Sequence, residues 1–304
     1  MRPPVVVVGA GAVGCLVAAR LSTRGEVHVV ARPRSGAAIA AAGGIRVEGR
    51  APGIYPVRVH TRFVLPPGAL VVVAVKAYDL EPLLRRLAPR LHPSHRVVLL
   101  QNGLGVATRA RALLGRPAIR AVTSLAATRL GPGRVRSVAT GPTCFALGSG
   151  LEAVWTAAGM PATAVADLRP HVWRKATVNA VINPLGALLG VENGRLLALR
   201  HTPRHIVAEV LRVALAWGQP MQFAPSLAHV RASMRRTARN TCSMLQDLQA
   251  GRPTEIEWLN GAIVRLGEAR GVPAPCNGAL AELVRARSAG LAPAPRRRAP
   301  SWRA

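Results

Sequence analysis

The chain has 304 residues, half of them hydrophobic, a length that predicts two domains, each with its own core. It contains no run of about 18 uncharged apolar residues, and its first apolar segment begins too close to Met1 for a signal peptide, so we expect a cytoplasmic protein and no membrane contact. The net charge is +28, but the arginines are dispersed and aromatic residues make up only 3%, so we expect no nucleic-acid partner.

Short β-branched runs alternate with helical patterns through the N-terminal half. A strand, a glycine-rich turn, a helix and a second strand follow one another, over Val5–Val8, Gly9–Gly14, Cys15–Leu21 and Val27–Ala31. Two further strands are predicted on either side of a helix at 79–91, over Leu70–Val75 and Val97–Leu100. This alternation predicts an α/β fold, a Rossmann-type doubly wound parallel sheet.

Beyond about Asp167 long helical patterns replace the short strands. The sequence therefore predicts an all-α C-terminal domain, with helices near 168–189, 202–217, 226–250, 254–270 and 276–287. We expect the first domain over 1–166, the second over 167–290, and a disordered basic tail over 291–304, which is rich in proline, alanine and arginine.

Lysine occurs only twice, at Lys76 and Lys175, in a chain whose other basic residues are arginines. A desolvated ammonium can give up its proton whereas a guanidinium stays charged, so both lysines are candidates for proton transfer, although two could also survive by chance. The four cysteines have neither metal-ligand nor disulfide spacing, and we expect reduced, buried thiols and no metal site.

The glycine-rich turn has the pattern GxGxxG: Gly9, Ala10, Gly11, Ala12, Val13 and Gly14. Following a strand and opening a helix, it predicts a dinucleotide site, with a tight turn that binds nothing as the alternative. Where NAD-dependent proteins usually carry an acidic residue, at the end of the second strand, this chain has Arg32, followed by Arg34. A guanidinium there can pair with a 2′-phosphate, so we expect NADPH, although an arginine-rich chain could place one there without function.

Lys76 and Asn102 each follow a predicted strand of the sheet. The carboxyl ends of parallel strands share one edge, which is where ligands bind in doubly wound folds. We therefore expect both residues to lie near Gly9, while an ordinary turn would also explain Asn102 and Gly103.

In the helical half, Lys175, Asn179 and Asn183 recur every four residues and so share one helix face. Their neighbours are mostly apolar, and buried polar groups need partners, which either a ligand or other helices could supply. Pro184 cannot donate to the carbonyl of Ala180, so a kink is expected there. Further on, Thr254 and Glu257 fit a capping box, which leaves Glu255 free to turn toward a ligand.

Together these motifs resemble the ketopantoate reductase (2-dehydropantoate 2-reductase) family over nearly all of residues 1 to 290. The resemblance rests on the GxGxxG turn and on Val75-Lys76-Ala77, Gln101-Asn102-Gly103, Lys175-xxx-Asn179-xxx-Asn183-Pro184, Asn193-Gly194 and Ser243-Met244-xx-Asp247-xxx-Gly251-Arg252-x-Thr254-Glu255-Ile256. It implies an N-terminal NADPH domain, a helical domain, and a substrate held between them.

The resemblance also implies the reaction, NADPH-dependent reduction of 2-dehydropantoate to (R)-pantoate on the route to pantothenate and coenzyme A. Lys175 resembles the proton donor, and the residues that resemble substrate contacts are Lys76, Asn179, Asn183, Asn193 and Ser243. Those that resemble positions around the cofactor are Asn102, Ala126 and Glu255. The alternatives are a reductase of another small 2-keto acid, a non-catalytic NADP sensor and a nucleic-acid-binding protein; we expect a monomer or homodimer.

Overall fold

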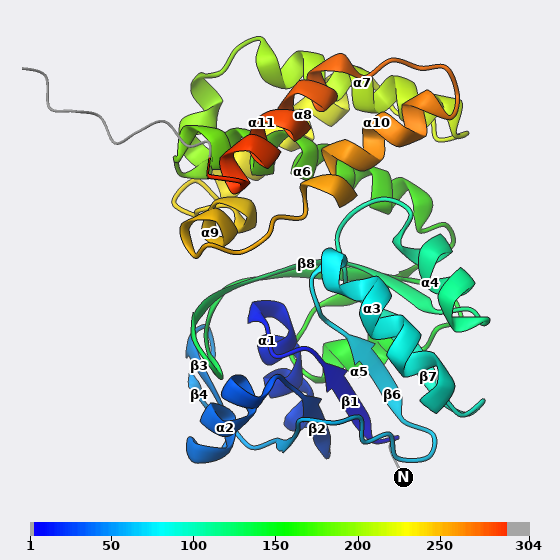
Figure 1. Ribbon diagram of the computed structural model, residues 1–304, viewed down its shortest axis with the longest axis vertical. Coiled ribbons are helices and arrows are strands. Elements are labelled where there is room, and N and C mark those ends of the chain that lie inside the picture. The colour runs from blue at the N-terminus through cyan, green and yellow to red at the C-terminus, as the bar shows by residue number, and fades with distance from the viewer. Residues whose placement is uncertain (1–2, 291–304) are drawn as a thin grey trace, which may run out of the picture. The chain divides into compact units, whose positions relative to one another are not determined.

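The computed structural model describes residues 3–290, and the chain forms two compact units, the first ending at Val172 and the second beginning at Trp173 (Figure 1). The expected tail over 291–304 lies outside the described residues. Within the described part of the chain, no helix combines the length and the apolar character that crossing a membrane requires.

A parallel sheet forms the centre of the N-terminal unit. Its strands lie in the order β5 (Arg58–His60), β2 (Val27–Val30), β1 (Val5–Val8), β6 (Leu70–Val73) and β7 (Arg96–Leu99). All neighbours in this part run parallel, with Val7 of β1 beside Val29 and Val72. β1 and β6 are buried along their whole length, which explains why both read as unbroken runs of apolar residues. The predicted α/β fold is confirmed.

A long antiparallel hairpin, which the sequence analysis did not anticipate, extends this sheet. β8 (Ile119–Gly131) pairs parallel with β7 and antiparallel with β9 (Arg134–Ala146). β3 (Ile45–Gly49) continues the sheet beyond β9, β4 (Gly53–Tyr55) pairs with β3, and β10 (Ala162–Val165) pairs with β9 outside the main path. Ten strands therefore join in one mixed sheet, parallel at its centre and partly antiparallel beyond.

Helix α1 (Ala12–Ser22) packs against β1 and β2 and also against β3, β8 and β9, as Figure 1 shows. Its residues from Gly14 to Leu21 are all buried, so α1 joins the two parts of the sheet in one hydrophobic core. The other helices of this unit are α2 (Pro33–Ala41), α3 (Ala77–Leu87), the short 3-10 helix η1 (Ala88–Arg90), α4 (Val106–Leu114) and α5 (Leu151–Ala157).

The second unit is helical. It contains most of α6 (Arg169–Leu189), η2 (Asn193–Ala198), α7 (Thr202–Ala216), α8 (Phe223–Arg236), α9 (Ser243–Gln249), η3 (Ile256–Trp258), α10 (Asn260–Glu268) and α11 (Pro275–Ser288). Helices α7, α10 and α11 pack on one another, and α8 packs on α7 and η2 (Figure 1). The all-α character of this domain is confirmed.

Two of the predicted helices are interrupted. The helix expected over 226–250 ends at Arg236, and α9 begins only at Ser243. The helix expected over 254–270 is a turn of 3-10 helix followed by α10, with a break at Leu259. The carbonyls of Ala238 and Asn240 explain the first break, because they accept hydrogen bonds from Gly194 and Asn193 instead of continuing a helix.

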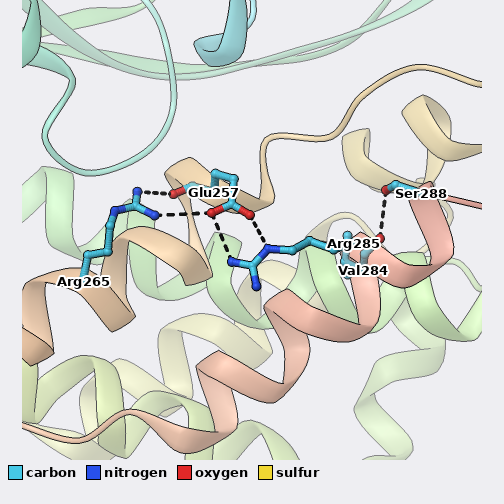
Figure 2. Close-up of polar contacts among 5 residues, drawn as sticks. All are labelled: Glu257, Arg265, Val284, Arg285 and Ser288. Atoms are coloured by element: carbon cyan, nitrogen blue, oxygen red, sulfur yellow. Dashed lines mark hydrogen bonds and ion pairs between the residues drawn. The ribbon is translucent and has the colours of Figure 1, made fainter.

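The capping box expected for Thr254 and Glu257 is wrong. No side chain caps η3, and the carboxylate of Glu257 pairs instead with Arg265 of α10 and Arg285 of α11 (Figure 2). These guanidinium groups hold the pKa of Glu257 below its ordinary value. Glu257 therefore links two helices at the surface rather than starting one.

All four cysteines are free thiols. Cys15 and Cys242 are buried, as expected, whereas Cys144 and Cys276 are partly exposed, which corrects the prediction of four buried thiols. Burial raises the pKa of Cys15 to about 12, so that thiol is a packing residue of α1.

Candidate active site

The glycine-rich turn between β1 and α1 has a steric reason for its first and last glycines. Gly9 has φ of +114°, and a Cβ atom there would lie 2.9 Å from Cγ1 of Val75. A Cβ atom on Gly14 would lie 1.9 Å from the carbonyl oxygen of Gly9. Both positions therefore require glycine for the turn itself, whether or not anything binds.

Gly11 is different, because a Cβ atom there would meet no atom of the described residues within 4 Å. It immediately precedes α1, whose first helical hydrogen bond runs from the N–H of Cys15 to the carbonyl of Gly11 at 2.9 Å. The N–H groups of Ala12, Val13 and Gly14 thus have no partner within the helix, and no acidic residue occupies the first turn. An open, uncrowded helix N-terminus of this kind fits a pyrophosphate.

Lys76 and Asn102 lie at the same sheet edge as this turn. Lys76 precedes α3, just beyond β6, and Asn102 lies just beyond β7, whose Leu99 is paired with Val73. Gln101 joins the two segments, because its buried side-chain Nε2 donates to the carbonyls of Val73 and Val75 at 2.9 and 3.0 Å. The structure therefore brings together the strand ends that the sequence predicted would converge.

Two residues that sequence reasoning missed support this edge. Gln101 was noted only as part of a motif, yet it fixes the loop geometry. Arg120 of β8 donates from Nη2 to the carbonyl of Gly103 at 2.7 Å, and burial lowers its pKa to about 10. The only sequence signal for Gln101 is that a glutamine directly follows a buried strand. For Arg120 the sequence offers no signal, because nothing sets it apart from the many other arginines of the chain.

Arg32 immediately precedes α2, at the carboxyl end of β2. Its side chain is 82% exposed and its Nη2 lies 2.9 Å from Oδ2 of Asp79, in the first turn of α3. The predicted phosphate-binding guanidinium therefore already has a carboxylate partner. Arg34 is exposed on α2, and Ala126 lies in the middle of β8, partly buried.

In the helical unit, Lys175, Asn179 and Asn183 lie along α6, and we call them the α6 polar stripe. Burial, together with the positive charge of Arg236 at the end of α8, lowers the pKa of Lys175 to about 8. The buried Nδ2 atom of Asn179 has no hydrogen-bond partner among residues 3–290. A desolvated ammonium followed by an unsatisfied amide is what a site for a polar ligand requires.

Asn183 and Ser243 are brought together, since the Ser243 hydroxyl, at the start of α9, donates to Oδ1 of Asn183 at 3.4 Å. Asn193 opens η2, is buried, and donates from Nδ2 to the Thr237 hydroxyl at 2.9 Å. Its Oδ1 atom is buried and finds no partner in the described part of the chain. The helical unit thus holds a second unsatisfied amide.

Close backbone approach makes this arrangement feasible. A Cβ atom on Gly186 of α6 would lie 3.0 Å from Sγ of Cys242, and one on Gly194 would lie 2.8 Å from Cβ of Ala238. Glycine at these positions lets the chain segments next to Ser243 and Asn193 pack against α6 and the end of α8. Glu255 is buried directly before η3.

A parallel sheet with an open glycine turn at its edge, followed by a helical unit with a desolvated lysine and a row of amides, defines a two-domain NAD(P)-dependent oxidoreductase. Models of the ketopantoate reductase PanE/ApbA family match residues 5–150, and models of its C-terminal domain match residues 167–288. The chain belongs to the ketopantoate reductase PanE/ApbA family.

Similar proteins support this membership along nearly the whole chain. A 2-dehydropantoate 2-reductase of Archaeoglobus fulgidus is 34% identical over 94% of this chain and 98% of its own length. A crystal structure of a PanE/ApbA family ketopantoate reductase from Ralstonia eutropha has a TM-score of 0.85 and 32% identity over 95% of this chain and 99% of its own. D-mandelate dehydrogenase, solved with NADH and anilino(oxo)acetate, has a TM-score of 0.86 and 25% identity over the same share of each chain.

Proposed function

We propose that this enzyme reduces 2-dehydropantoate to (R)-pantoate with NADPH, on the route to pantothenate and coenzyme A. The observation that carries the proposal is Lys175, an ammonium with a pKa lowered to about 8, on the same helix face as Asn179 and Asn183. The similarity to 2-dehydropantoate 2-reductases over nearly the full chain supports the choice of substrate.

The residues of the chain supply the proton and the binding groups. Reduction of the ketone builds negative charge on its oxygen, and Lys175 stabilises that charge and donates a proton to the same oxygen. Asn179, Asn183, Asn193 and Ser243 hold the substrate, and the unsatisfied amide atoms of Asn179 and Asn193 are available for its carboxylate and hydroxyl groups. Lys76 contacts the substrate or the nicotinamide end of the cofactor.

The N-terminal unit binds the dinucleotide in this proposal. The turn from Gly9 to Gly14 holds the pyrophosphate at the start of α1, and Arg32 holds the 2′-phosphate, with Asn102 and Ala126 as further contacts around the cofactor. The family resemblance adds Glu255, which belongs to the helical unit. NADPH, when bound, supplies the hydride that is added to C2. The fit rests on the open space at Gly11 and on the first N–H groups of α1, which have no acceptor within the helix.

A second candidate substrate is a bulkier 2-keto acid, favoured by the likeness to D-mandelate dehydrogenase. The same relative was solved with NADH, and Arg32 here is paired with a carboxylate, so the cofactor also needs a direct comparison. Both alternatives keep Lys175 in the same chemical role.

One assay tests the activity, the substrate and the cofactor together. The consumption of NADPH and of NADH is followed spectrophotometrically with 2-dehydropantoate, 2-oxo-2-phenylacetate and simple aliphatic 2-keto acids. We expect the highest kcat/KM for NADPH with 2-dehydropantoate. A higher kcat/KM with 2-oxo-2-phenylacetate would show that 2-dehydropantoate is not the preferred substrate, and a higher kcat/KM with NADH would show that NADPH is not the preferred cofactor. No turnover with any keto acid would refute the proposed activity.

A further inference from the structure

Helix α6 contains a proline in its interior, just beyond the polar stripe. Pro184 has no N–H group, so the carbonyl of Ala180 loses the donor that would close the helical hydrogen bond. Ala180 is completely buried, where an unsatisfied carbonyl is costly. The Ala180 carbonyl therefore needs a donor from elsewhere in the fold.

Asn260, the first residue of α10, supplies that donor. Its Nδ2 atom lies 3.0 Å from the Ala180 carbonyl oxygen and 3.0 Å from Oδ1 of Asn277 on α11. Both asparagines are completely buried. The side-chain amide of Asn260 thus uses both of its protons, one on the Ala180 carbonyl of α6 and one on Asn277 of α11.

A buried carboxylate fixes the direction of this network. Glu209 of α7, only 3% exposed, accepts hydrogen bonds from the backbone N–H groups of Cys276 and Asn277, at 2.8 and 2.9 Å, and from Nδ2 of Asn277, at 2.8 Å. A carboxylate only accepts, so Asn277 presents its amino group to Glu209 and its oxygen to Asn260. Asn260 must then donate, which is what the Ala180 carbonyl requires.

We propose that Asn260 is a positioning residue: its side-chain amide replaces the hydrogen bond that Pro184 withholds from Ala180, and so holds Lys175 and Asn179 in register with Asn183. Ala180 and Pro184 bound the turn of α6 that contains Asn183 and follows Lys175 and Asn179. The network anchors this turn to α7, α10 and α11, which carry none of the stripe residues. The catalytic consequence rests on the proposed function of Lys175.

The test compares stability with catalysis in Asn260→Ala and in Asn260→Ala/Pro184→Ala. The first variant leaves the Ala180 carbonyl without a donor. The second restores an N–H group at position 184, which can close the helical hydrogen bond but also removes the proline ring and the kink that it is expected to impose on the helix. We expect Asn260→Ala to lower Tm and to lower kcat about tenfold, the effect of a modest misplacement of a reacting group, with the Kd for NADPH unchanged. The double variant should recover most of Tm but not kcat.

A second measurement does not depend on turnover. Because the chain has only two lysines, reductive methylation with 13C-formaldehyde gives one side-chain NMR signal for each, and Lys76→Arg assigns them. The signal of Lys175 should titrate near pH 8 in the parent protein. In Asn260→Ala and in the double variant it should titrate measurably higher, because a displaced Lys175 is less desolvated.

Val213→Ala is the matched control. Val213 is a completely buried residue of α7 that packs near Gly267 of α10 and belongs to neither the stripe nor the network. It should lower Tm without changing kcat or the titration of Lys175. If kcat and the lysine titration recover together with Tm in the double variant, or if Asn260→Ala behaves like Val213→Ala, Asn260 has no positioning role. Full turnover in Lys175→Ala would instead count against the proposed function, and the NMR titration would still decide on Asn260.

Discussion

The two halves of this enzyme prepare for a ligand in different ways. In the N-terminal unit, backbone groups form most of the candidate cofactor site: the glycines, the strand ends and the N–H groups of α1. The charged side chain assigned to the 2′-phosphate in the proposal, Arg32, lies at the surface. In the helical unit the candidate site consists of buried or half-buried side chains, and hidden amides hold them in place. A site made from backbone should tolerate changes in neighbouring side chains, whereas one made from buried amides should not.

The largest expected effect comes from the helical unit. Lys175→Ala should lower kcat by roughly 10² or more, the range for loss of a general acid, while the Kd for NADPH stays within about twofold because the glycine turn proposed to bind the dinucleotide lies in the N-terminal unit. Stopped-flow or steady-state kinetics with fluorescence titration of NADPH measures both. Lys175→Arg is the matched control, since it keeps the charge but not a proton that can be transferred, and it should be nearly as impaired. Turnover close to that of the parent in Lys175→Ala would rule out the assignment.

Gly11 offers the corresponding test of the backbone site in the N-terminal unit. Gly11→Ala adds a methyl group where the protein itself has no atom within 4 Å, so Tm should be unchanged. The methyl group would occupy the space that the pyrophosphate needs, and the Kd for NADPH should rise roughly tenfold or more, as expected for overpacking a tight contact.

Gly14→Ala is the control for this change, because its Cβ atom would meet the Gly9 carbonyl and should lower Tm before any cofactor is added. Calorimetry with and without NADPH separates the two effects. An unchanged affinity in Gly11→Ala would show that the dinucleotide does not approach this turn.

The N-terminal unit is easier to predict from the sequence than the helical unit, because its candidate site is formed by backbone groups and strand ends. The glycine turn, β1, β6 and β7 follow from local patterns, because buried parallel strands read as apolar runs and a turn with positive φ reads as glycine. The hairpin of β8 and β9 was missed because arginines, threonines and serines interrupt its alternation, although Gly131-Pro132-Gly133 marks its turn. Register shifts along the pair weaken the period further.

In the helical half the stripe itself was predictable, but its support was not. The break after Arg236 contains neither glycine nor proline, and it arises because Ala238 and Asn240 bond to the segment of Asn193 and Gly194. Asn260 was placed inside a long helix, whereas the structure puts it at the start of α10, where it reaches Ala180, 80 residues earlier. Hydrogen bonds over such separations leave no periodic signal in one sequence.

The pH dependence of kcat gives a third, smaller test of the helical site. Lys175 must be protonated to act as the donor, and its pKa is lowered to about 8, so kcat should be level below pH 8 and fall about tenfold per unit above it. The linked effect on stability has the opposite direction. Because the folded pKa lies below the ordinary value of 10.5, the cost of holding the charged lysine is full below pH 8 and is relieved as pH rises toward 10.5. A kcat profile that stays level to pH 10 would exclude Lys175 as the donor.

The smallest expected effect concerns the surface pair of the N-terminal unit. Asp79→Asn removes the carboxylate that lies 2.9 Å from Arg32, which frees the guanidinium for a 2′-phosphate and removes a negative charge that would repel one. Exposed ion pairs are worth at most about 1 kcal/mol, so the ratio of kcat/KM for NADPH to that for NADH should rise about two- to fivefold. Arg32→Ala should shift the same ratio the other way by weakening NADPH alone. Parallel titrations at low and high salt measure the change and its screening. A rise in kcat/KM for NADH in Asp79→Asn would mean that the carboxylate opposes both cofactors equally, and Arg32 would then have no part in choosing between them.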